Sequence, residues 1–247
     1  MSDITCIYPD NLIFPLSTQA AFRILRKLKK KNNVLNVNAS SGEIDMTKYR
    51  NKFDLAKSGY RVFTGAQVLR YRTTMAPTQG DVIYLNIRLS EFSAERKEHI
   101  ANERIVMQRI TGVDSNARLI MTIIPGGNLC ANSTNYIPKN DAYDLRLVLG
   151  ILNSNLINFH FKQTSTNTNI TTSEINNIPI INAAGVQRSR IISIVDKILA
   201  IAKDDDYLDS SVKKDKVREY EKQIDQMVYK LYGLTEEEIK VVEAKGE

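Results

Sequence analysis

Residues 142–161, AYDLRLVLGILNSNLINFHF, decide how the rest of the chain is interpreted. Apolar side chains recur in them at every third or fourth position, which is the repeat of a helix with one buried face. The stretch therefore predicts one amphipathic helix that packs on a sheet. Its apolar face comprises Leu145, Val148, Leu149, Leu152, Leu156 and Phe159.

Two further segments follow this helix. Residues 162–174, KQTSTNTNITTSE, are almost entirely polar and predict a long loop. Residues 175–180, INNIPI, are apolar and contain a proline, and the residue before a proline favours an extended backbone. They are expected to return the chain to the core as a short extended segment.

The sheet is predicted upstream. Short apolar runs rich in β-branched residues are separated by Gly, Pro, Asn and Asp, a pattern typical of a mixed or antiparallel sheet. In the third run, Ile105 and Met107 should face one side and Val106 and Ile110 the other, with Gln108 and Arg109 as polar intrusions that reach a ligand or a neighbouring strand. The runs are YRVFTGAQVLRY (60–71), DVIYLNI (81–87), RIVMQRI (104–110) and RLIMTIIP (118–125).

Helices are predicted at both ends of the chain. Ser17 is a suitable N-cap for a basic amphipathic helix that ends near Lys31. Residues 187–203 and 213–233 carry apolar stripes of similar length and predict an antiparallel hairpin, with Gly233 as C-cap. We therefore expect an α+β fold, with a recognition domain over 1–183 and a helical hairpin with a C-terminal helix over 184–247.

Composition is that of an ordinary globular protein. The chain has 247 residues and a net charge of +6, which favours a polyanionic partner without requiring one. No run reaches the roughly 18 apolar residues of a bilayer span, and we find no export signal, so a soluble cytoplasmic protein is expected. Cys6 and Cys130 lack metal-ligand spacing and predict two free thiols.

No complete active site is apparent in the sequence. The glycines of IIPGGNL (123–129) lack the spacing of a nucleotide-binding loop. The sequence also contains no Pro-Pro dipeptide, which is part of the motif that positions the base in amino-methyltransferases. His99 and His160 have no companion ligands at metal spacing. We expect no catalysis, cofactor or metal. The alternative is a Mg²⁺-dependent nuclease that uses a degenerate set formed by Asp10, Glu95 and Lys97.

Segment 162–174 suits contact with DNA, although composition alone favours a merely solvated loop. Its side chains are of the kinds that bond base edges and phosphate oxygens. The candidates for base contact are Lys162, Gln163, Thr164, Ser165, Thr166, Asn167, Thr168 and Asn169. The candidates for phosphate contact are Lys27, Lys29, Lys30, Lys31, Arg70, Arg72 and Lys139.

The order of these motifs resembles the TaqI-like C-terminal specificity domain, the target-recognition domain of type IIG restriction–modification enzymes and related adenine methyltransferases. The resemblance covers roughly residues 55–243 and is most specific in two places: LGILNSNLINFHFK (149–162) with NNIPI (176–180), and IDQMVYKLYGLTEEEI (224–239). It implies that the chain recognises double-stranded DNA mainly through the major groove, with segment 162–174 and residues 65–72 as the contacts.

The methyltransferase and nuclease regions of that family are missing from this sequence. The resemblance therefore implies a fragment of a larger enzyme or a separate specificity subunit that directs a DNA methyltransferase or endonuclease module, with the hairpin as the attachment surface. Type I specificity subunits, which also use long helices, are a related pattern. The same helices offer a surface for a homodimer. A helical assembly protein without specific DNA binding is the remaining alternative.

Overall fold

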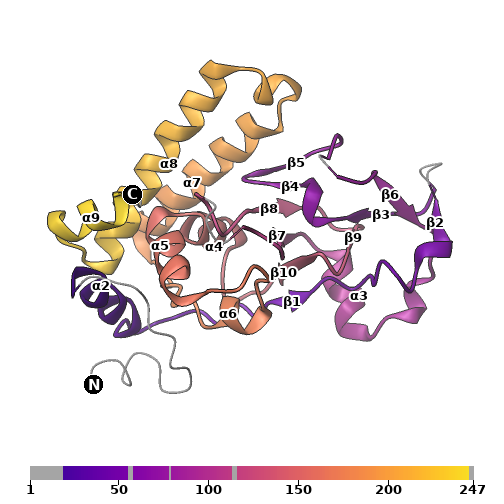
Figure 1. The fold of residues 1–247 in the computed structure, drawn as a ribbon, viewed down its shortest axis with the longest axis horizontal. Helices are drawn as coiled ribbons and strands as arrows, with labels where there is room; N and C mark the ends of the chain where they lie inside the picture. The colour runs from indigo at the N-terminus through magenta and orange to yellow at the C-terminus, as the bar shows by residue number, and fades with distance from the viewer. Residues whose placement is uncertain (1–18, 55–57, 78, 113–115, 245–247) are drawn as a thin grey trace.

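The computed structural model describes residues 19–54, 58–77, 79–112 and 116–244. Its α+β architecture confirms the expected fold class. The body of the molecule is built on two small sheets, and the C-terminal helices project from one end of it (Figure 1).

The first sheet positions the region of interest. Its strands are antiparallel in the order β1 (Ser40–Ser41), β10 (Thr134–Pro138), β7 (Arg104–Gln108) and β8 (Met121–Ile124). Strand β7 is central and buried on both faces: Ile105 and Met107 enter the main core, and Val106 enters a smaller core with Phe63 and Tyr136. The predicted alternation of β7 is confirmed. Ile110, by contrast, lies beyond the strand and is exposed.

The second sheet is mixed, in the order β2 (Phe53–Asp54), β6 (Ile83–Leu85), β3 (Tyr60–Phe63) and β9 (Leu129–Cys130). The strand expected over 60–71 is interrupted after β3 by a 3-10 turn, Gly65–Gln67, before the β4 (Val68–Leu69) and β5 (Arg72–Thr73) hairpin. The buried pair Arg104–Glu43, 2.8 Å apart, joins the two sheets, because Glu43 also accepts from the main-chain N–H of Cys130.

The prediction of one long helix over 142–161 is wrong, because two helices, α4 (Leu145–Leu152) and α5 (Asn155–Thr164), meet there at a break. Ser154 adopts an extended backbone there, and its hydroxyl accepts from the N–H of Ile157 as the N-cap of α5. The loop expected over 162–174 is also shorter than predicted. It spans 165–171, because α5 continues to Thr164 and a helix α6 (Thr172–Asn176) follows. The first residues of the expected extended segment, Ile175 and Asn176, are therefore helical.

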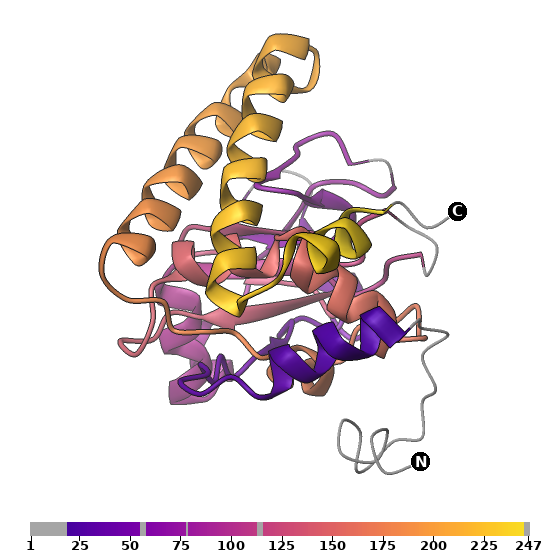
Figure 2. The ribbon, with the colours of Figure 1, turned by 90° about the vertical axis from the view of Figure 1, so that its left-hand side faces the viewer.

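The C-terminal hairpin is confirmed. Helices α7 (Gly185–Lys203) and α8 (Ser211–Tyr232) run antiparallel side by side (Figure 2), and their apolar stripes pack on each other and on α4. Gly233 ends α8 in the left-handed conformation, with φ of 69°. Helix α9 (Glu236–Glu243) then packs on α2 (Gln19–Lys29). The expected N-cap Ser17 lies outside the described residues.

The main core includes side chains from α2 and from α4 to α9, so the hairpin and the recognition region share buried surface. The division of the chain at residue 184 stays a prediction. Within the part of the chain that is described, no helix is long and apolar enough to cross a membrane. Helix α3 (Ala94–Ala101) covers the second sheet and completes the fold.

Close packing of α4 on α7 depends on Gly150. A β-carbon there would lie 2.9 Å from a methyl group of Ile191 and 2.9 Å from one of Val195. We expect Gly150→Val to lower the free energy of unfolding by about 2 kcal/mol, because a packed interior accommodates added methyl groups poorly. Chemical denaturation measures this, with Ala200→Val on the exposed face of α7 as the control. A Gly150→Val protein as stable as the wild type would contradict the packing.

Candidate nucleic-acid interface

Loop 165–171 connects α5 to α6 and presents four consecutive exposed residues, Thr166 to Asn169. No hydrogen bond from these four side chains to any other described residue is present. The remaining candidates for base contact lie differently. Lys162, Gln163 and Thr164 form the last turn of α5, where the Thr164 hydroxyl donates to the carbonyl of His160, and Ser165 is buried. The exposed part of the predicted set is therefore Lys162 together with residues 166–169.

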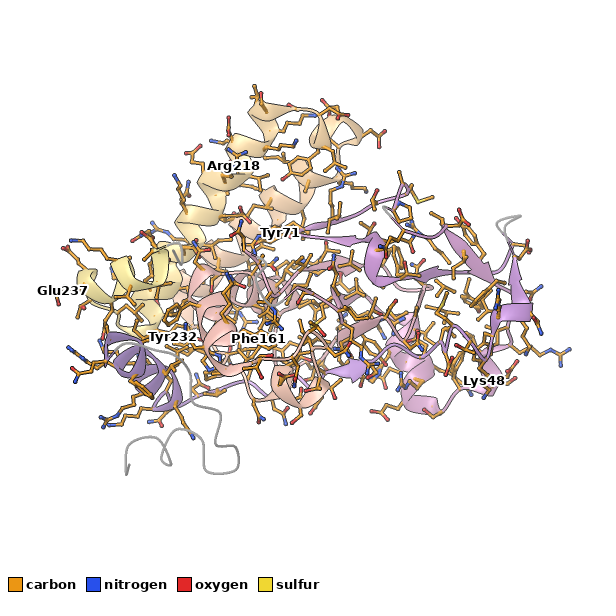
Figure 3. The ribbon with its side chains drawn as sticks, in the orientation of Figure 1. Lys48, Tyr71, Phe161, Arg218, Tyr232 and Glu237 are labelled. Atoms are coloured by element: carbon orange, nitrogen blue, oxygen red, sulfur yellow. The ribbon has the colours of Figure 1, made fainter. Side chains whose placement is uncertain are left out.

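A buried arginine holds the main chain of this loop. Arg118 has no solvent exposure, and its guanidinium donates to the carbonyls of Ser165 and Asn167 and to the hydroxyl of Thr111. The guanidinium also lies 5.5 Å from the ring of Phe161, which is labelled in Figure 3. Among the described residues, no carboxylate forms a salt bridge with Arg118. Its guanidinium is instead hydrogen-bonded to carbonyl and hydroxyl oxygens. These bonds fix residues 165–167 in one conformation.

The residues that follow β7 hold the other half of the loop. The N–H of Thr111 donates to the carbonyl of Thr168 over 3.1 Å, and the N–H of Ile170 donates to the carbonyl of Arg109 over 2.7 Å. These bonds flank an antiparallel bridge between Ile110 and Asn169. The amide of Asn135, in β10, donates to the carbonyl of Ile170. The loop is thus attached to the central sheet through its main chain, while the side chains of Thr166 to Asn169 remain available.

The segment that begins at Gly65 is also connected to the end of β7, through Ser133. Ser133, in the turn before β10, accepts from the N–H of Arg109 through its carbonyl and from the N–H of Gly65 through its hydroxyl. A β-carbon on Gly65 would lie 2.8 Å from the Ser133 carbonyl oxygen, so glycine permits this approach. The start of segment 65–72, through Ser133, and loop 165–171 are therefore both connected to the residues that follow β7.

Several surface residues here were not among the sequence candidates: Ile110, Asn132 and Ser133. Arg109 was noticed as a polar intrusion, and its guanidinium donates to the carbonyl of Asn132 over 3.1 Å. The sequence signal that could have identified Ile110 is its position just after a run of buried residues, next to Thr111 and Gly112.

The arginines of the β4–β5 hairpin point toward the helices. Arg70 pairs with Glu221 of α8 and donates to the carbonyl of Asn153, and Arg72 lies 5.6 Å from the ring of Tyr207. Tyr71, between them in the turn of the β4–β5 hairpin, has a φ of 62° and is labelled in Figure 3. Both arginines thus have partners within the fold, and their contact with phosphate stays a prediction.

The lysines among the phosphate candidates are dispersed. Lys27 pairs with Glu238 of α9 over 2.6 Å, and Lys31 donates to the carbonyl of Leu231, so the basic end of α2 serves the packing of the C-terminal helices. Lys29, the last residue of α2, and Lys30, which follows it, are exposed. Lys139 follows β10, about 13 Å along the strand from Asn135, the residue whose amide bonds the loop.

The elements of the nuclease alternative do not come together in the described residues. Asp10 lies outside them, as does Cys6, and both Glu95 and Lys97 are exposed on the short helix α3. Nowhere in the described ranges do three or more His, Cys, Asp or Glu side chains gather in an arrangement that could hold a metal ion. Burial raises the pKa of the Cys130 thiol to about 12, so this thiol stays protonated at neutral pH.

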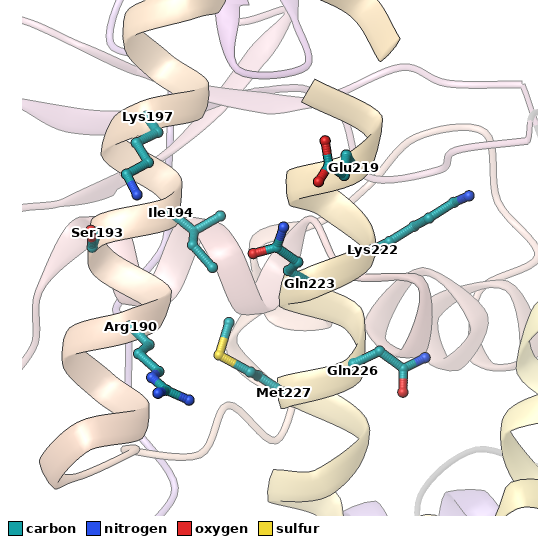
Figure 4. Close-up of a pocket in the computed structure, with 9 residues that line it drawn as sticks. All are labelled: Arg190, Ser193, Ile194, Lys197, Glu219, Lys222, Gln223, Gln226 and Met227. Atoms are coloured by element: carbon teal, nitrogen blue, oxygen red, sulfur yellow. The ribbon is translucent and has the colours of Figure 1, made fainter. Parts of the chain in front are cut away.

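A groove of about 670 Å³ runs between α7 and α8 on the outer face of the hairpin (Figure 4). Ile194 and Met227 form its apolar floor, and Arg190, Lys197 and Lys222 make its rim mainly basic. The groove lies on different elements from loop 165–171, so the two surfaces are separate.

Comparison with known proteins finds a matching family model and a similar solved structure. The family model of the TaqI-like C-terminal specificity domain matches residues 60–180. A structure of the type IIL restriction–modification enzyme MmeI in complex with DNA shares the fold, with a TM-score of 0.54 and 12% sequence identity. The match covers 85% of this chain and 35% of the MmeI chain. No curated protein sequence matched this chain.

Replacing Arg118 should destabilise the loop and the fold together. We expect Arg118→Leu to lower the free energy of unfolding by about 3 kcal/mol, because carbonyls and a hydroxyl in the interior lose their donor. Chemical denaturation measures the loss. Arg190→Leu, on the exposed face of α7, is the control, and an equal effect of both substitutions would contradict the role of Arg118.

The contact of α8 with α5 through Asp225 predicts that the free energy of unfolding depends on pH. Burial raises the pKa of Asp225 from its ordinary value of 3.8 to about 7, although the carboxylate accepts from the N–H of Asn155 and lies near Arg70. The folded state therefore holds a proton that the unfolded state releases, and this contribution to stability is lost as the pH rises from about 4 to about 7. We expect Asp225→Asn, which keeps the acceptor oxygen, to remove that part of the dependence in denaturation measured from pH 4 to 8. An unchanged profile would show that Asp225 is ionised in the folded protein.

Proposed function

We propose that this chain, whose residues 60–180 form a TaqI-like C-terminal specificity domain, recognises a short sequence of double-stranded DNA as the specificity module of a restriction–modification enzyme. The observation that carries the proposal is loop 165–171: its main chain is fixed by Arg118 and the end of β7, while the side chains of Thr166 to Asn169 are exposed and unpaired within the described residues.

A fixed loop is what base recognition requires. Hydrogen bonds to base edges discriminate between sequences when donors and acceptors are held in place, and each bidentate pair contributes about 1–3 kcal/mol. Phosphate contacts add affinity without sequence preference. Exposed Lys162 borders the loop, and the net charge of +6 favours approach to a polyanion.

The chemistry would come from elsewhere. The chain spans about a third of the MmeI chain, and its described residues hold no metal-binding cluster. We propose that it is not itself an enzyme and that it directs a DNA methyltransferase or endonuclease module, in the same polypeptide or in a separate subunit. The hairpin groove, with its apolar floor and basic rim, is the surface proposed for that attachment or for a homodimer.

Selection of the purified chain against a random duplex library at about 150 mM salt tests DNA recognition. We expect a short enriched motif for the wild type. A variant with Thr166, Asn167, Thr168 and Asn169 replaced by alanine should lose the motif but keep weak, salt-sensitive binding, because phosphate contacts remain. Asn177→Ala, an exposed site just beyond α6, is the control and should retain the motif.

Two results would overturn the proposal. Retention of the motif by the alanine variant would show that another surface reads the bases. Absence of DNA binding at low salt, together with concentration-dependent self-association of the chain, would instead support a role in helical assembly.

A further inference from the structure

The bridge between loop 165–171 and the end of β7 has a defined geometry. The two hydrogen bonds that flank it join Thr111 to Thr168 and Ile170 to Arg109, so Ile110 and Asn169 themselves form a non-hydrogen-bonded pair. In such a pair the Cα atoms lie about 4.5 Å apart and both side chains project from the same face. An isoleucine and an asparagine are therefore presented side by side.

Both side chains face solvent. Ile110 is 61% exposed and belongs to none of the apolar cores, and Asn169 is exposed with no hydrogen bond from its amide to other described residues. A single exposed isoleucine is common on protein surfaces. This one stands on main chain that is bonded on both sides, beside the side chains of Thr166 to Asn169, which bond no other residue in the described ranges.

This combination matches one base pair in the major groove. Adenine presents N7 as an acceptor and N6 as a donor, which one amide satisfies with two hydrogen bonds, and its thymine partner presents a methyl group to an apolar side chain. Guanine presents two acceptors, O6 and N7, which would leave the amide oxygen opposite an acceptor, and cytosine has no methyl group. The pair is thus complementary to A·T and not to G·C.

We propose that Ile110 and Asn169 together read one A·T base pair in the target, with the Asn169 amide on the adenine and Ile110 against the thymine methyl group. This inference rests on the proposed function. It adds Ile110, a residue outside the loop, to the surface that determines specificity. Because Arg118 holds the Asn167 carbonyl and Asn135 holds the Ile170 carbonyl, the pair is oriented before DNA binds.

Base analogues test the pairing directly. In the motif retained by the wild type, each thymine is replaced by uracil, which removes only the methyl group, and each adenine by 7-deazaadenine, which removes the N7 acceptor. We expect one base pair at which uracil weakens wild-type binding about fourfold, the equivalent of one buried methyl group. At the same pair, 7-deazaadenine should weaken binding about tenfold, because one of the two hydrogen bonds is lost and the Asn169 N–H is left without an acceptor.

The variants then assign each effect to a side chain. In Ile110→Ala the uracil substitution at that pair should have no further effect, and in Asn169→Ala the 7-deazaadenine substitution should have none. Val212→Ala, at a 77% exposed apolar site on α8, and Asn177→Ala should respond to both analogues as the wild type does. Both Ile110 and Asn169 are exposed, so their variants should keep the thermal unfolding midpoint of the wild type.

Three results would overturn the proposal that Ile110 and Asn169 are a reading pair for one A·T base pair, while leaving the proposed function intact. These are a motif without an A·T pair, analogue effects that persist in the variants, and effects of the two variants at different base pairs. Failure of the proposed function is distinct, because the wild type would then enrich no motif before any variant is made, and the reading pair would fall with it.

Discussion

The burial of β7 on both faces is the constraint on which the rest of the structure depends. Its side chains alternate between the main core, through Ile105 and Met107, and the smaller core, through Val106, so the strand cannot shift by one residue without exchanging these sets. The main chain that leaves this fixed strand at Arg109 carries the bonds to loop 165–171. The position of an exposed loop is therefore set by the register of a strand in the centre of the molecule.

Features that depend on local periodicity could be predicted from the sequence. The alternation of β7 and the stripes of α7 and α8 are of this kind, because burial of one face imposes a repeat on neighbouring residues. Gly233 ends α8 as its position suggests. The broken helix at Ser154 marks the limit, since the apolar repeat of α4 and α5 continues across the break, and the serine that caps α5 carries no stronger signal than any other serine.

The candidate site could be predicted only in part, because its organising contacts join residues far apart in the chain. Segment 162–174 stood out by composition, but the role of Arg118 appears only when the carbonyls of Ser165 and Asn167 are placed beside it. Arg70 shows what charge alone leaves out: its contact with phosphate stays a prediction, and its partner within the fold, Glu221, lies 151 residues later. Charge in a sequence gives no indication of which counter-charge the fold supplies.

The loop is held through main-chain groups. This separates the stability of the fold from the chemistry of the exposed side chains, two properties that selection usually acts on together. The carbonyls bonded by Arg118 and Asn135, and the N–H groups of Thr111 and Ile170, are the same whatever side chains stand at 166–169. Mutations at those four positions therefore alter the chemistry offered to a partner without removing contacts that keep the protein folded. Under the proposed function, a lineage that carries this architecture can change the DNA sequence it reads by single substitutions, without compensating mutations in the core.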